Sequence, residues 1–338
     1  MDKKEYEAVE NIKTHTSYNI ELLARLIVSG ASFLTLREKS IFLRFLLNDG
    51  ENPLQNEKSF LDRFLSLTIT DISLAVKRVF PRAKWSSSET LKKVRIAQKI
   101  MSAQQIFQTC YLDSDYPAML REMRDPPFLL FYRGNLEILN RKCVSVVGTR
   151  RAGSSALKAA TDFSKEACDE GFCVVSGLAF GIDGASHKGA LLSQNPATCA
   201  VLPSGIDMIT PQSHTKLAAK ILERGGLIMS EYLPGTPSVQ FRYVQRNRIV
   251  ASLSPATVVI QAPMGSGAMI TASLALDYNR EVFFHKQCFS SEALAINQFS
   301  ELQYKKKNTN TPQAFVDDGA AVIANFEEFK EVLNYGKG

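Results

Sequence analysis

The sequence predicts an α/β protein, in which an extended Rossmann-like, doubly wound sheet follows a small helical N-terminal domain. From about residue 143 onward, short apolar runs alternate with helix-like stretches. Runs that are apolar on both faces and joined by helices are typical of a parallel sheet covered on both sides. Before about residue 106, apolar residues recur at helical spacing and no strong strand candidate is found.

We expect three segments in the chain, because 338 residues exceed what a single core of roughly 250 to 300 residues usually holds. Residues 1–106 are expected to form the helical domain and residues 143–338 the Rossmann-like domain. Between them, residues 107–142 form a connecting segment that leads into the sheet, and its run "FLLFYRG" is typical of a strand.

The expected strands of the sheet are the apolar runs CVSVVG (143–148), FCVVSG (172–177), TCAVLPSG (198–205), LIMSEY (227–232) and ATVVIQAP (256–263). In the following part of the chain, "KKKNTNTPQ" (305–313) is typical of a solvated loop. A final strand, "AAVIAN" (320–325), and a final helix, "FEEFKEVLNY" (326–335), complete the prediction.

Composition excludes several classes of protein. Hydrophobic residues make up 45% and charged residues 22% of the chain, which is ordinary for a globular fold and argues against wholesale disorder. The six cysteines form no CxxC pair, and the four histidines lack the spacing of metal ligands. No signal-peptide segment and no apolar run of about 20 residues is present. We therefore expect a cytoplasmic protein without a metal site or membrane segment.

The first strand leads into a glycine-flanked loop that resembles a phosphate-binding loop in outline only. Gly148 and Gly153 have the G-x-x-x-x-G spacing of NTPases, but Ser154 stands where that motif has its lysine. A nicotinamide site is also disfavoured, because the second strand ends in Ser176 and Gly177 where a ribose-binding carboxylate would be expected. No nucleotide cofactor is therefore predicted.

What the first loop retains is the start of a helix beside two arginines. Backbone N–H groups at a helix N-terminus bind anions, and Ser154 or Ser155 is expected as the cap. Arg150 and Arg151 stand at the mouth of the loop. This combination predicts a general anion site.

Glycine-rich loops follow the later strands as well. Gly181 belongs to the second loop, Gly205 to the third, and Gly265, Ser266 and Gly267 to the fifth. Any one of them is explained by backbone geometry alone. Several on one edge of a sheet provide a row of N–H groups and hydroxyls, which suits an extended chain of phosphates better than a single mononucleotide.

The most basic stretch of the sheet domain is "QFRYVQRNRIVASLS" (240–254), in which arginines alternate with aromatic and amide side chains: Arg242, Arg246 and Arg248 with Phe241, Tyr243 and Asn247. Guanidinium groups neutralise phosphates and aromatic rings accept any base face, so this pattern favours single-strand binding. The alternative is that these arginines form ion pairs inside the domain, with Glu231 as partner, and it applies more to Arg248 than to Arg246.

A catalytic site is not predicted. Asp183 is interpreted as a helix cap or a buried hydrogen-bond acceptor, although His187 one turn later could pair with it. No candidate nucleophile stands at a strand–turn–helix elbow. We therefore expect a protein that is not an enzyme.

Taken in order, the motifs "VVGTRRAGSSA", "VVSGLAFGIDGASHKGAL", "AVLPSGID", "SEYLPGTP", "RNRIVASLS" and "VVIQAPMGSGAMITASLAL" resemble those of the DNA-processing protein A family, also called Smf. The resemblance covers about residues 115–285. It implies a non-catalytic, single-stranded DNA-binding recombination mediator that protects incoming DNA and loads the RecA recombinase during natural transformation (competence). It also implies a homodimer and a sterile-alpha-motif-like N-terminal domain. The C-terminal winged-helix domain of many relatives is not expected here.

The resemblance places DNA contacts at Arg150, at Arg246, Asn247 and Arg248, and at Ser266, Gly267 and Thr271. Combined with the loops above, the expected DNA-binding residues are Gly148, Thr149, Arg150, Arg151, Ser176, Gly177, Phe180, Gly181, Lys188, Tyr243, Arg246, Asn247, Arg248, Ser266, Gly267 and Thr271. Phe180 and Gly265 stand where the family usually has basic residues, so Phe180 is interpreted as a stacking surface.

Two other functions stay open. The stretch "PMGSGAMIT" also resembles the lysine-decarboxylase-like nucleotide hydrolases, but the glutamate that those enzymes carry soon after the loop is absent from "ASLALD", which follows Thr271. The second alternative is a scaffold with weakened DNA binding, because Phe180 and Gly265 remove two positive charges.

Overall fold

A computed structural model describes residues 20–48, 57–295 and 310–335. The N-terminal part is helical, as the sequence predicts: residues 20–30 form a helix, followed by α2 (Leu36–Leu47), α3 (Glu57–Ser66), α4 (Ile69–Val76) and α5 (Ser87–Gln104). Helix α2 starts at a capping box, in which the carboxylate of Glu38 accepts the N–H of Thr35 at 2.8 Å. The rings of Phe42 and Phe64 pack edge-on against Trp85 in the centre of this helical region.

The strands of the described residues form one nine-stranded sheet with the order β1-β2-β6-β5-β4-β3-β7-β8-β9. The strands are β1 (Phe107–Cys110), β2 (Leu129–Gly134), β3 (Cys143–Val147), β4 (Cys173–Ser176), β5 (Thr198–Val201), β6 (Leu227–Ser230), β7 (Ala256–Val259), β8 (Glu281–His285) and β9 (Ala321–Ile323). Strands β3 to β9 are mutually parallel, which confirms the doubly wound α/β prediction.

The connecting segment, residues 107–142, forms two strands of the sheet itself. Strand β2 pairs antiparallel with β6, with Phe131 opposite Ser230, and β1 pairs antiparallel with β2. The sheet is therefore mixed, with two antiparallel strands at the edge next to the helical region. Part of the sheet precedes residue 143, and the domain boundary expected there stays a prediction.

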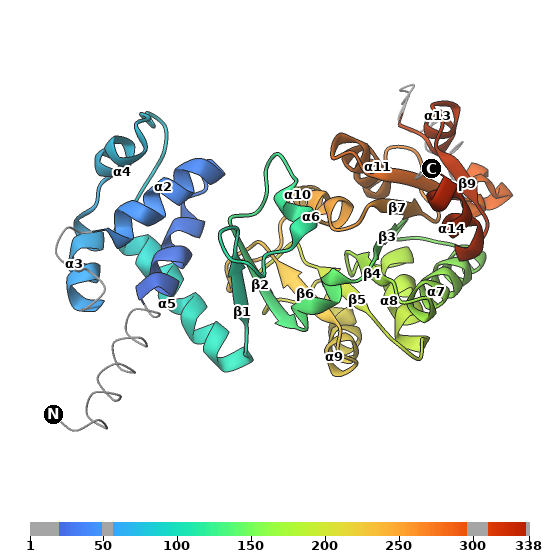
Figure 1. The fold of residues 1–338 in the computed structure, drawn as a ribbon, viewed down its shortest axis with the longest axis horizontal. Helices are drawn as coiled ribbons and strands as arrows, with labels where there is room; N and C mark the ends of the chain where they lie inside the picture. Colours follow the sequence, from blue (N-terminus) through green and yellow to red (C-terminus); the bar gives the residue numbers. More distant parts are fainter. Residues whose placement is uncertain (1–19, 49–56, 296–309, 336–338) are drawn as a thin grey trace.

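Helices cover both faces of the sheet (Figure 1). One face carries α7 (Ser154–Asp169), α8 (Ile182–Leu192), α9 (Thr215–Glu223) and α14 (Phe326–Tyr335); the other carries α6 (Ala118–Arg121), α10 (Gln240–Ser252), α11 (Gly267–Asp277) and α13 (Pro312–Asp317). Strand β3 serves both faces, since Val144 and Val146 pack toward α7 while Cys143 and Val147 pack toward α10 and α11. Short 3-10 helices lie at Leu136–Asn140, Gln212–His214 and Lys286–Phe289.

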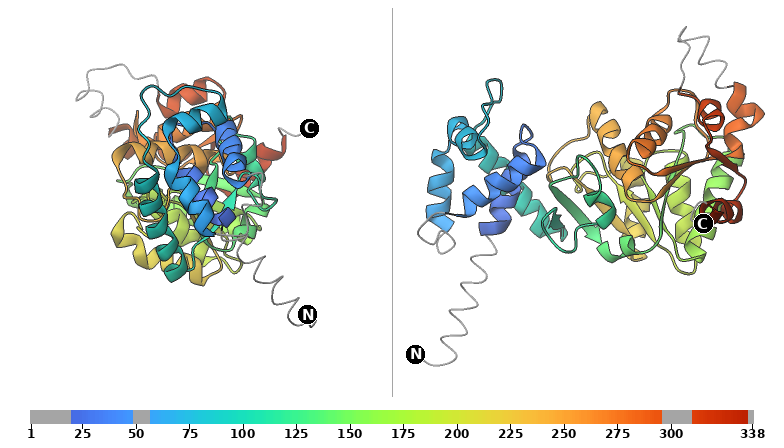
Figure 2. Two further views of the ribbon diagram at one scale, coloured as in Figure 1. Left: turned by 90° about the vertical axis from the view of Figure 1, so that its left-hand side faces the viewer. Right: turned by 45° about the horizontal axis from the view of Figure 1, so that its top comes forward.

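The helical region lies at the end of the molecule next to β1, as Figures 1 and 2 show. Its buried residues form one continuous apolar cluster with Phe128 and Phe131 of the sheet domain. The guanidinium of Arg25 also forms an ion pair with Asp113 at 2.6 Å, and the ammonium of Lys39 lies 5.9 Å from the ring centroid of Phe128. Apolar packing and polar contacts thus hold this region against the sheet.

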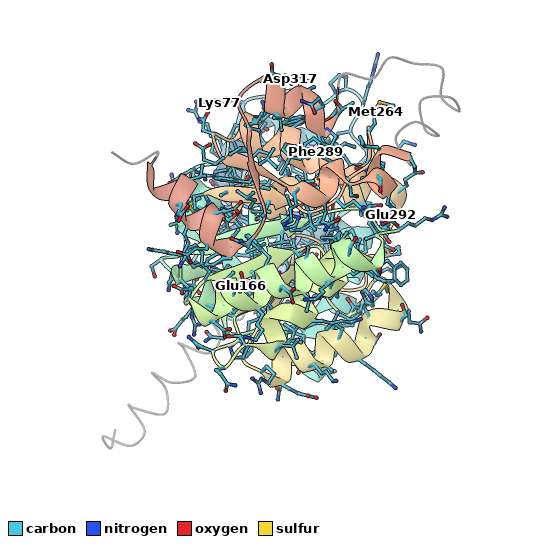
Figure 3. The ribbon with its side chains drawn as sticks, turned by 90° about the vertical axis from the view of Figure 1, so that its right-hand side faces the viewer. Lys77, Glu166, Met264, Phe289, Glu292 and Asp317 are labelled. Atoms are coloured by element: carbon cyan, nitrogen blue, oxygen red, sulfur yellow. The ribbon has the colours of Figure 1, made fainter. Side chains whose placement is uncertain are left out.

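The strand order reverses between β3 and β7, and this reversal positions the site. The chain leaves β3 for α7 on one face and leaves β7 for α11 on the other. Ligands of such sheets bind in the crevice that opens between the carboxyl ends of the two strands. Figure 3 shows the α7 side of this arrangement, where the carboxylate of Glu166 accepts the N–H of Phe326 at 3.4 Å at the start of α14.

Across residues 20–48, 57–295 and 310–335, no helix combines the length and apolar character that crossing a bilayer requires.

Within α8, His187 is fully buried, and its Nδ1 lies 2.7 Å from the hydroxyl of Thr198. The pairing of His187 with Asp183 is therefore wrong: the imidazole points to the sheet, where β5 supplies its partner. The pKa of His187 is lowered to about 3, chiefly by burial, and the nearby charges of His214 and Arg246 act in the same direction.

The depressed pKa of His187 makes the stability of the fold depend on pH. An unfolded chain protonates a histidine near pH 6.5, whereas the folded chain keeps His187 neutral down to about pH 3. The unfolded state therefore binds more protons in this window, and stability falls as the pH is lowered. Between pH 7.5 and 5, we expect His187 to cost about 2 kcal/mol of unfolding free energy.

Urea denaturation at both pH values, for the wild type and for His187→Leu, measures this cost. The variant should lose less stability on acidification than the wild type. Thr198 keeps a partner in the variant, because its hydroxyl also donates to the carbonyl of Val174 at 2.8 Å. Equal losses in the two proteins would show that His187 is not the group responsible.

Candidate nucleic-acid interface

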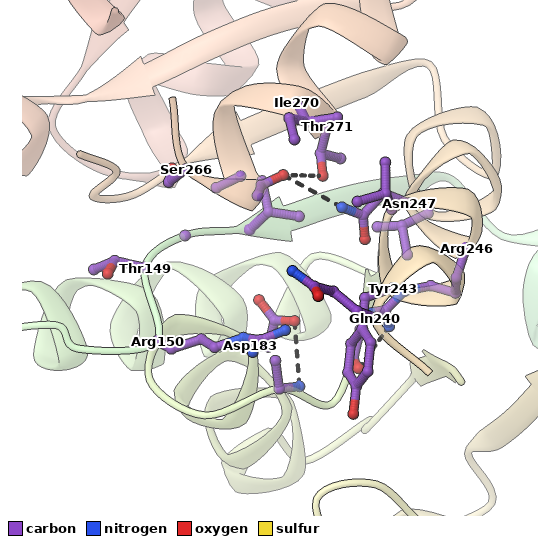
Figure 4. A pocket seen from close by; sticks show the side chains of 18 of the residues that line it. Thr149, Arg150, Asp183, Gln240, Tyr243, Arg246, Asn247, Ser266, Ile270 and Thr271 are labelled. Atoms are coloured by element: carbon purple, nitrogen blue, oxygen red, sulfur yellow. Dashed lines mark hydrogen bonds between the residues drawn. The ribbon is translucent and has the colours of Figure 1, made fainter. Parts of the chain in front are cut away.

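A crevice of about 800 Å³ opens at the carboxyl ends of β3, β4 and β7, between the first two loops, α10 and the start of α11 (Figure 4). It brings together most of the residues that the sequence singles out: Gly148, Thr149, Arg150, Arg151, Gly177, Tyr243, Arg246, Asn247, Ser266, Gly267 and Thr271 line it. These residues come from four segments that are far apart in the chain. The reversal of strand order brings them together.

The mouth of the crevice pairs a cation with an aromatic ring. The guanidinium of Arg150 lies 5.0 Å from the ring centroid of Tyr243, which is cation–π distance. Arg150 and Arg151 are both exposed. Among the residues that the structure describes, neither has a carboxylate within ion-pair distance. Both positive charges are therefore available to an anionic ligand.

Arg246 forms the floor of the crevice and is only 3% exposed. Its guanidinium donates to the carbonyl of Gly177 at 2.6 Å and to the carbonyl of Val201, so it joins the loop after β4 and the end of β5 to α10. The approach is so close that a side chain at position 177 would collide with the guanidinium, which explains the glycine. Burial lowers the pKa of Arg246, and the negative charge of Asp183 partly offsets this effect.

The charge of Asp183 acts on this buried cation. Asp183 is confirmed as a buried hydrogen-bond acceptor, because its carboxylate accepts the N–H of Ala179 at 3.3 Å. Burial raises the pKa of Asp183, while the positive charge of Arg246 acts in the opposite direction. The carboxylate therefore serves the loop after β4 and the buried guanidinium.

Arg248 lies outside the crevice, two residues further along α10. Its guanidinium forms an ion pair with Glu231 at 2.5 Å and a longer one with Asp125 at 3.4 Å. Of the two readings weighed for this arginine, the structure shows the ion pair. Residues i and i+2 of a helix face different directions, so Arg246 and Arg248 cannot both face one ligand.

The start of α11 forms the opposite wall. The carbonyl of Gly267 accepts the Asn247 amide at 3.3 Å and the Thr271 hydroxyl at 3.0 Å, which fixes both side chains at the crevice (Figure 4). Ser266 is the N-cap residue of α11, and its hydroxyl is buried without a hydrogen-bond partner among the described atoms. The free N–H groups of this helix start and the serine hydroxyl form a small set of donors for an anion.

The remaining residues expected to bind DNA do not line the crevice. The hydroxyl of Ser176 donates to the carbonyl of Val146 at 2.7 Å, inside the sheet. Phe180 is exposed and packs edge-on against His214, with 5.2 Å between ring centroids. Gly181 precedes α8, and Lys188 is exposed on that helix. The lysine-rich stretch at 305–307 lies outside the described residues.

The first loop differs from expectation at the start of α7. A cap at Ser154 or Ser155 is wrong: Gly153 is the N-cap residue and no side-chain hydrogen bond caps the helix. Instead, the carboxylate of Glu292, labelled in Figure 3, packs against Gly153 so closely that a side chain there would collide with it. The Ser155 hydroxyl donates to Gln287 at 3.2 Å. A carboxylate is favourable at a helix N-terminus, so this part of the predicted anion site holds an internal anion.

The sequence reasoning missed the part of the crevice that precedes and begins α10, namely Ser238, Val239, Gln240 and Val244. A signal was present for two of them. Gln240 and Val244 are neighbours of Tyr243 and Asn247 on one face of a helix, at spacings of three and four residues. Extending that face back by one turn would have found Gln240. Among the described residues, no cluster of three or more potential metal ligands is present.

Comparison with known proteins places these features in a family. Residues 107–334 match the family model for DNA recombination-mediator protein A. The protein Smf of Borreliella burgdorferi is 31% identical over 264 residues, covering 78% of this chain and 83% of its own. The DNA processing protein DprA of Streptococcus pneumoniae is 39% identical over 172 residues, covering 51% of this chain and 60% of its own.

Solved structures of the same kind of protein are similar in fold. DNA processing protein A from Streptococcus pneumoniae superimposes with a TM-score of 0.64 at 28% identity, over 90% of this chain and 94% of that one. DNA processing protein A from Helicobacter pylori, whose structure concerns its mode of binding single-stranded DNA, gives a TM-score of 0.56 at 25% identity. That match covers 69% of this chain and 97% of the other.

The position of Arg246 predicts a loss of stability when it is replaced. Arg246→Met leaves the carbonyls of Gly177 and Val201 without their donor and Asp183 without its neighbouring charge. We expect the free energy of unfolding to fall by about 2 to 4 kcal/mol. Arg150→Met, at an exposed position, should change it by less than about 0.5 kcal/mol. Urea denaturation of both variants measures the contrast, and similar values for the two would refute the structural role of Arg246.

Proposed function

The chain belongs to the DNA recombination-mediator protein A family, and from this membership we propose that it binds single-stranded DNA in the crevice between β3, β4 and β7. The observation that carries the proposal is the pair of Arg150 and Tyr243 at the mouth, 5.0 Å apart. An exposed guanidinium next to an aromatic face provides for both parts of a nucleotide in a single strand, the phosphate and the base.

The spread of donors supports a strand rather than a mononucleotide. Four segments line the crevice: the first loop, the loop after β4, α10 and the start of α11. The donors are therefore spread along the crevice and are not gathered in a single loop, as they would be around one phosphate. We propose that the strand contacts Gly148, Thr149, Arg150, Arg151, Gly177, Tyr243, Asn247, Ser266, Gly267 and Thr271. Phe180, Gly181 and Lys188 would meet it on the flank of the second loop.

Three further residues have supporting roles in this proposal. Arg246 contributes positive charge from beneath the crevice, because its hydrogen bonds go to protein carbonyls. Arg248 holds α10 through its ion pair with Glu231, and Ser176 holds the end of β4. Arg248 and Ser176 thus act on the DNA strand through the backbone they position, whereas Arg246 also acts through its charge.

We propose further that the protein is a recombination mediator and not an enzyme. In this proposal the protein protects incoming single-stranded DNA and loads RecA during natural transformation, as a cytoplasmic homodimer. The family description, DNA recombination-mediator protein A, supports the mediator part of it. RecA filament assembly on coated single strands, measured with and without this protein, tests the mediator step. Nucleotide hydrolysis is disfavoured, because residues 272–276, which follow Thr271 in α11, carry no carboxylate.

Charge at the mouth predicts a salt-dependent loss of binding for Arg150→Gln. Each phosphate neutralised on a single strand contributes about 0.7 to the slope of log affinity against log salt concentration. We expect the variant to bind about 5- to 10-fold more weakly than the wild type near 0.1 M salt, with a slope shallower by about 0.7. A salt titration with fluorescent single-stranded DNA measures both quantities.

Arg82→Gln is the matched control, because Arg82 is exposed in the helical region and the variant removes the same charge away from the crevice. It should bind like the wild type. If Arg150→Gln and Arg82→Gln have the same affinity and slope, the crevice is not where the strand binds.

The ring of Tyr243 predicts a different signature. Tyr243→Leu removes the aromatic face and should weaken binding by about 1 to 2 kcal/mol, which is roughly 5- to 30-fold, with the salt slope unchanged. Tyr243→Phe keeps the ring and should bind within about twofold of the wild type. A loss in both variants would mean that the hydroxyl, not the stacking face, makes the contact.

A further inference from the structure

A second group of aromatic and cationic side chains lies on α10 and just after β6, outside the residues assigned to the crevice. The guanidinium of Arg242 lies 5.5 Å from the ring centroid of Phe241 and 5.1 Å from that of Tyr232. Phe241 is 63% exposed, which is unusual for a residue of this size on an ordered helix. We call Tyr232, Phe241 and Arg242 the α10 flank.

The α10 flank is continuous with the crevice. Gln240, Tyr243 and Asn247 face the crevice at helical spacing. Val244 lines the crevice as well and is 45% exposed, and it is three residues from Phe241, so the two lie on the same side of the helix. A ligand that leaves the crevice over Val244 therefore meets Phe241 next.

Polar contacts hold the Tyr232 ring and the Arg242 guanidinium in place. Arg242 donates to the carbonyl of Pro237, and the hydroxyl of Tyr232 donates to Gln245 at 3.0 Å. Within the described part of the chain, no carboxylate lies within ion-pair distance of Arg242. The positive charge beside Phe241 is thus uncompensated and partly exposed.

We propose that the α10 flank is a second base-stacking site, which takes a base on Phe241 and the neighbouring phosphate on Arg242 as a single strand leaves the crevice. This inference rests on the proposed function. The flank repeats the combination of Arg150 with Tyr243 at the mouth, a guanidinium over an aromatic face. Every base offers a π-face and every linkage a negative charge, so the flank complements nucleic acid.

The proposal fixes the direction of the strand. Phe241 lies in the first turn of α10, and Tyr232 is the second residue after β6, the β-strand that pairs with β2 near the helical region. A DNA strand that passes from Tyr243 over Val244 to Phe241 therefore runs toward the helical region. Affinity should then continue to rise with strand length after the crevice is filled.

Binding of two strand lengths tests this. One strand of about six nucleotides fills the crevice, and one of about twenty also reaches the flank. Phe241→Ala should weaken binding of the long strand by about fivefold or more and leave the short strand within about twofold of the wild type. The control is Phe107→Ala, because Phe107 is 56% exposed on the edge strand β1, remote from the crevice. It should bind both strands like the wild type.

A long strand that keeps its phosphates but lacks bases beyond the first six or so nucleotides separates stacking from charge. The wild type should bind it more weakly than the intact long strand, and Phe241→Ala should bind the two equally. If the wild type binds both lengths and Phe241→Ala matches it on both, the flank proposal is wrong and the crevice proposal stands. If the wild type binds neither length, both proposals fail.

Two other outcomes also overturn the flank proposal. An equal loss on both lengths would place Phe241 within the crevice contacts. A change in oligomeric state of Phe241→Ala, seen by size-exclusion chromatography and without any change in DNA affinity, would assign the surface to a second copy of the chain.

Discussion

The buried guanidinium of Arg246 is the constraint on which the site depends. Taking a cation out of water is costly, and here two backbone carbonyls and the charge of Asp183 offset that cost. Because those carbonyls belong to the loop after β4 and to the last residue of β5, one side chain fixes both segments relative to α10. The glycine at position 177 follows from the same contact. The shape of the crevice and the positive potential beneath it therefore have a common origin.

The topology of the sheet brings together the segments that Arg246 connects. Parallel strands bring the ends of β3, β4 and β7 to one edge, and the reversal of strand order sends α7 and α11 to opposite faces, which opens the crevice between them. The local sequence then determines which groups each wall of the crevice presents to a ligand. At α11, the helix start presents Ser266 and its backbone donors, whereas at α7 the Glu292 carboxylate already lies against the helix start. Two similar loops thus have different capacities for phosphate.

The strands β3 to β7 and the edge at which their loops gather were predictable, because apolar runs joined by helices specify a parallel sheet without knowledge of distant contacts. The pairing of β2 with β6 was not, since it joins segments nearly a hundred residues apart. The roles of Arg246 and Arg248 were also only half predictable. A basic pattern shows that arginines are present, but which one is buried depends on carbonyls and carboxylates supplied by other segments. The Gly153 cap and the His187–Thr198 contact were missed for the same reason.

Helix α10 divides its tasks by face. One face points Tyr243 into the crevice, a second leaves Phe241 exposed, and a third carries Arg248 to Glu231. The carboxylate of Glu231 also attracts the ammonium of Lys39 on α2, where burial lowers the pKa of the lysine and Glu231 partly offsets that effect. The helix that presents the aromatic residues to a strand is thereby connected to the helical region. The acid that holds α10 through Arg248 thus also interacts electrostatically with the helical region.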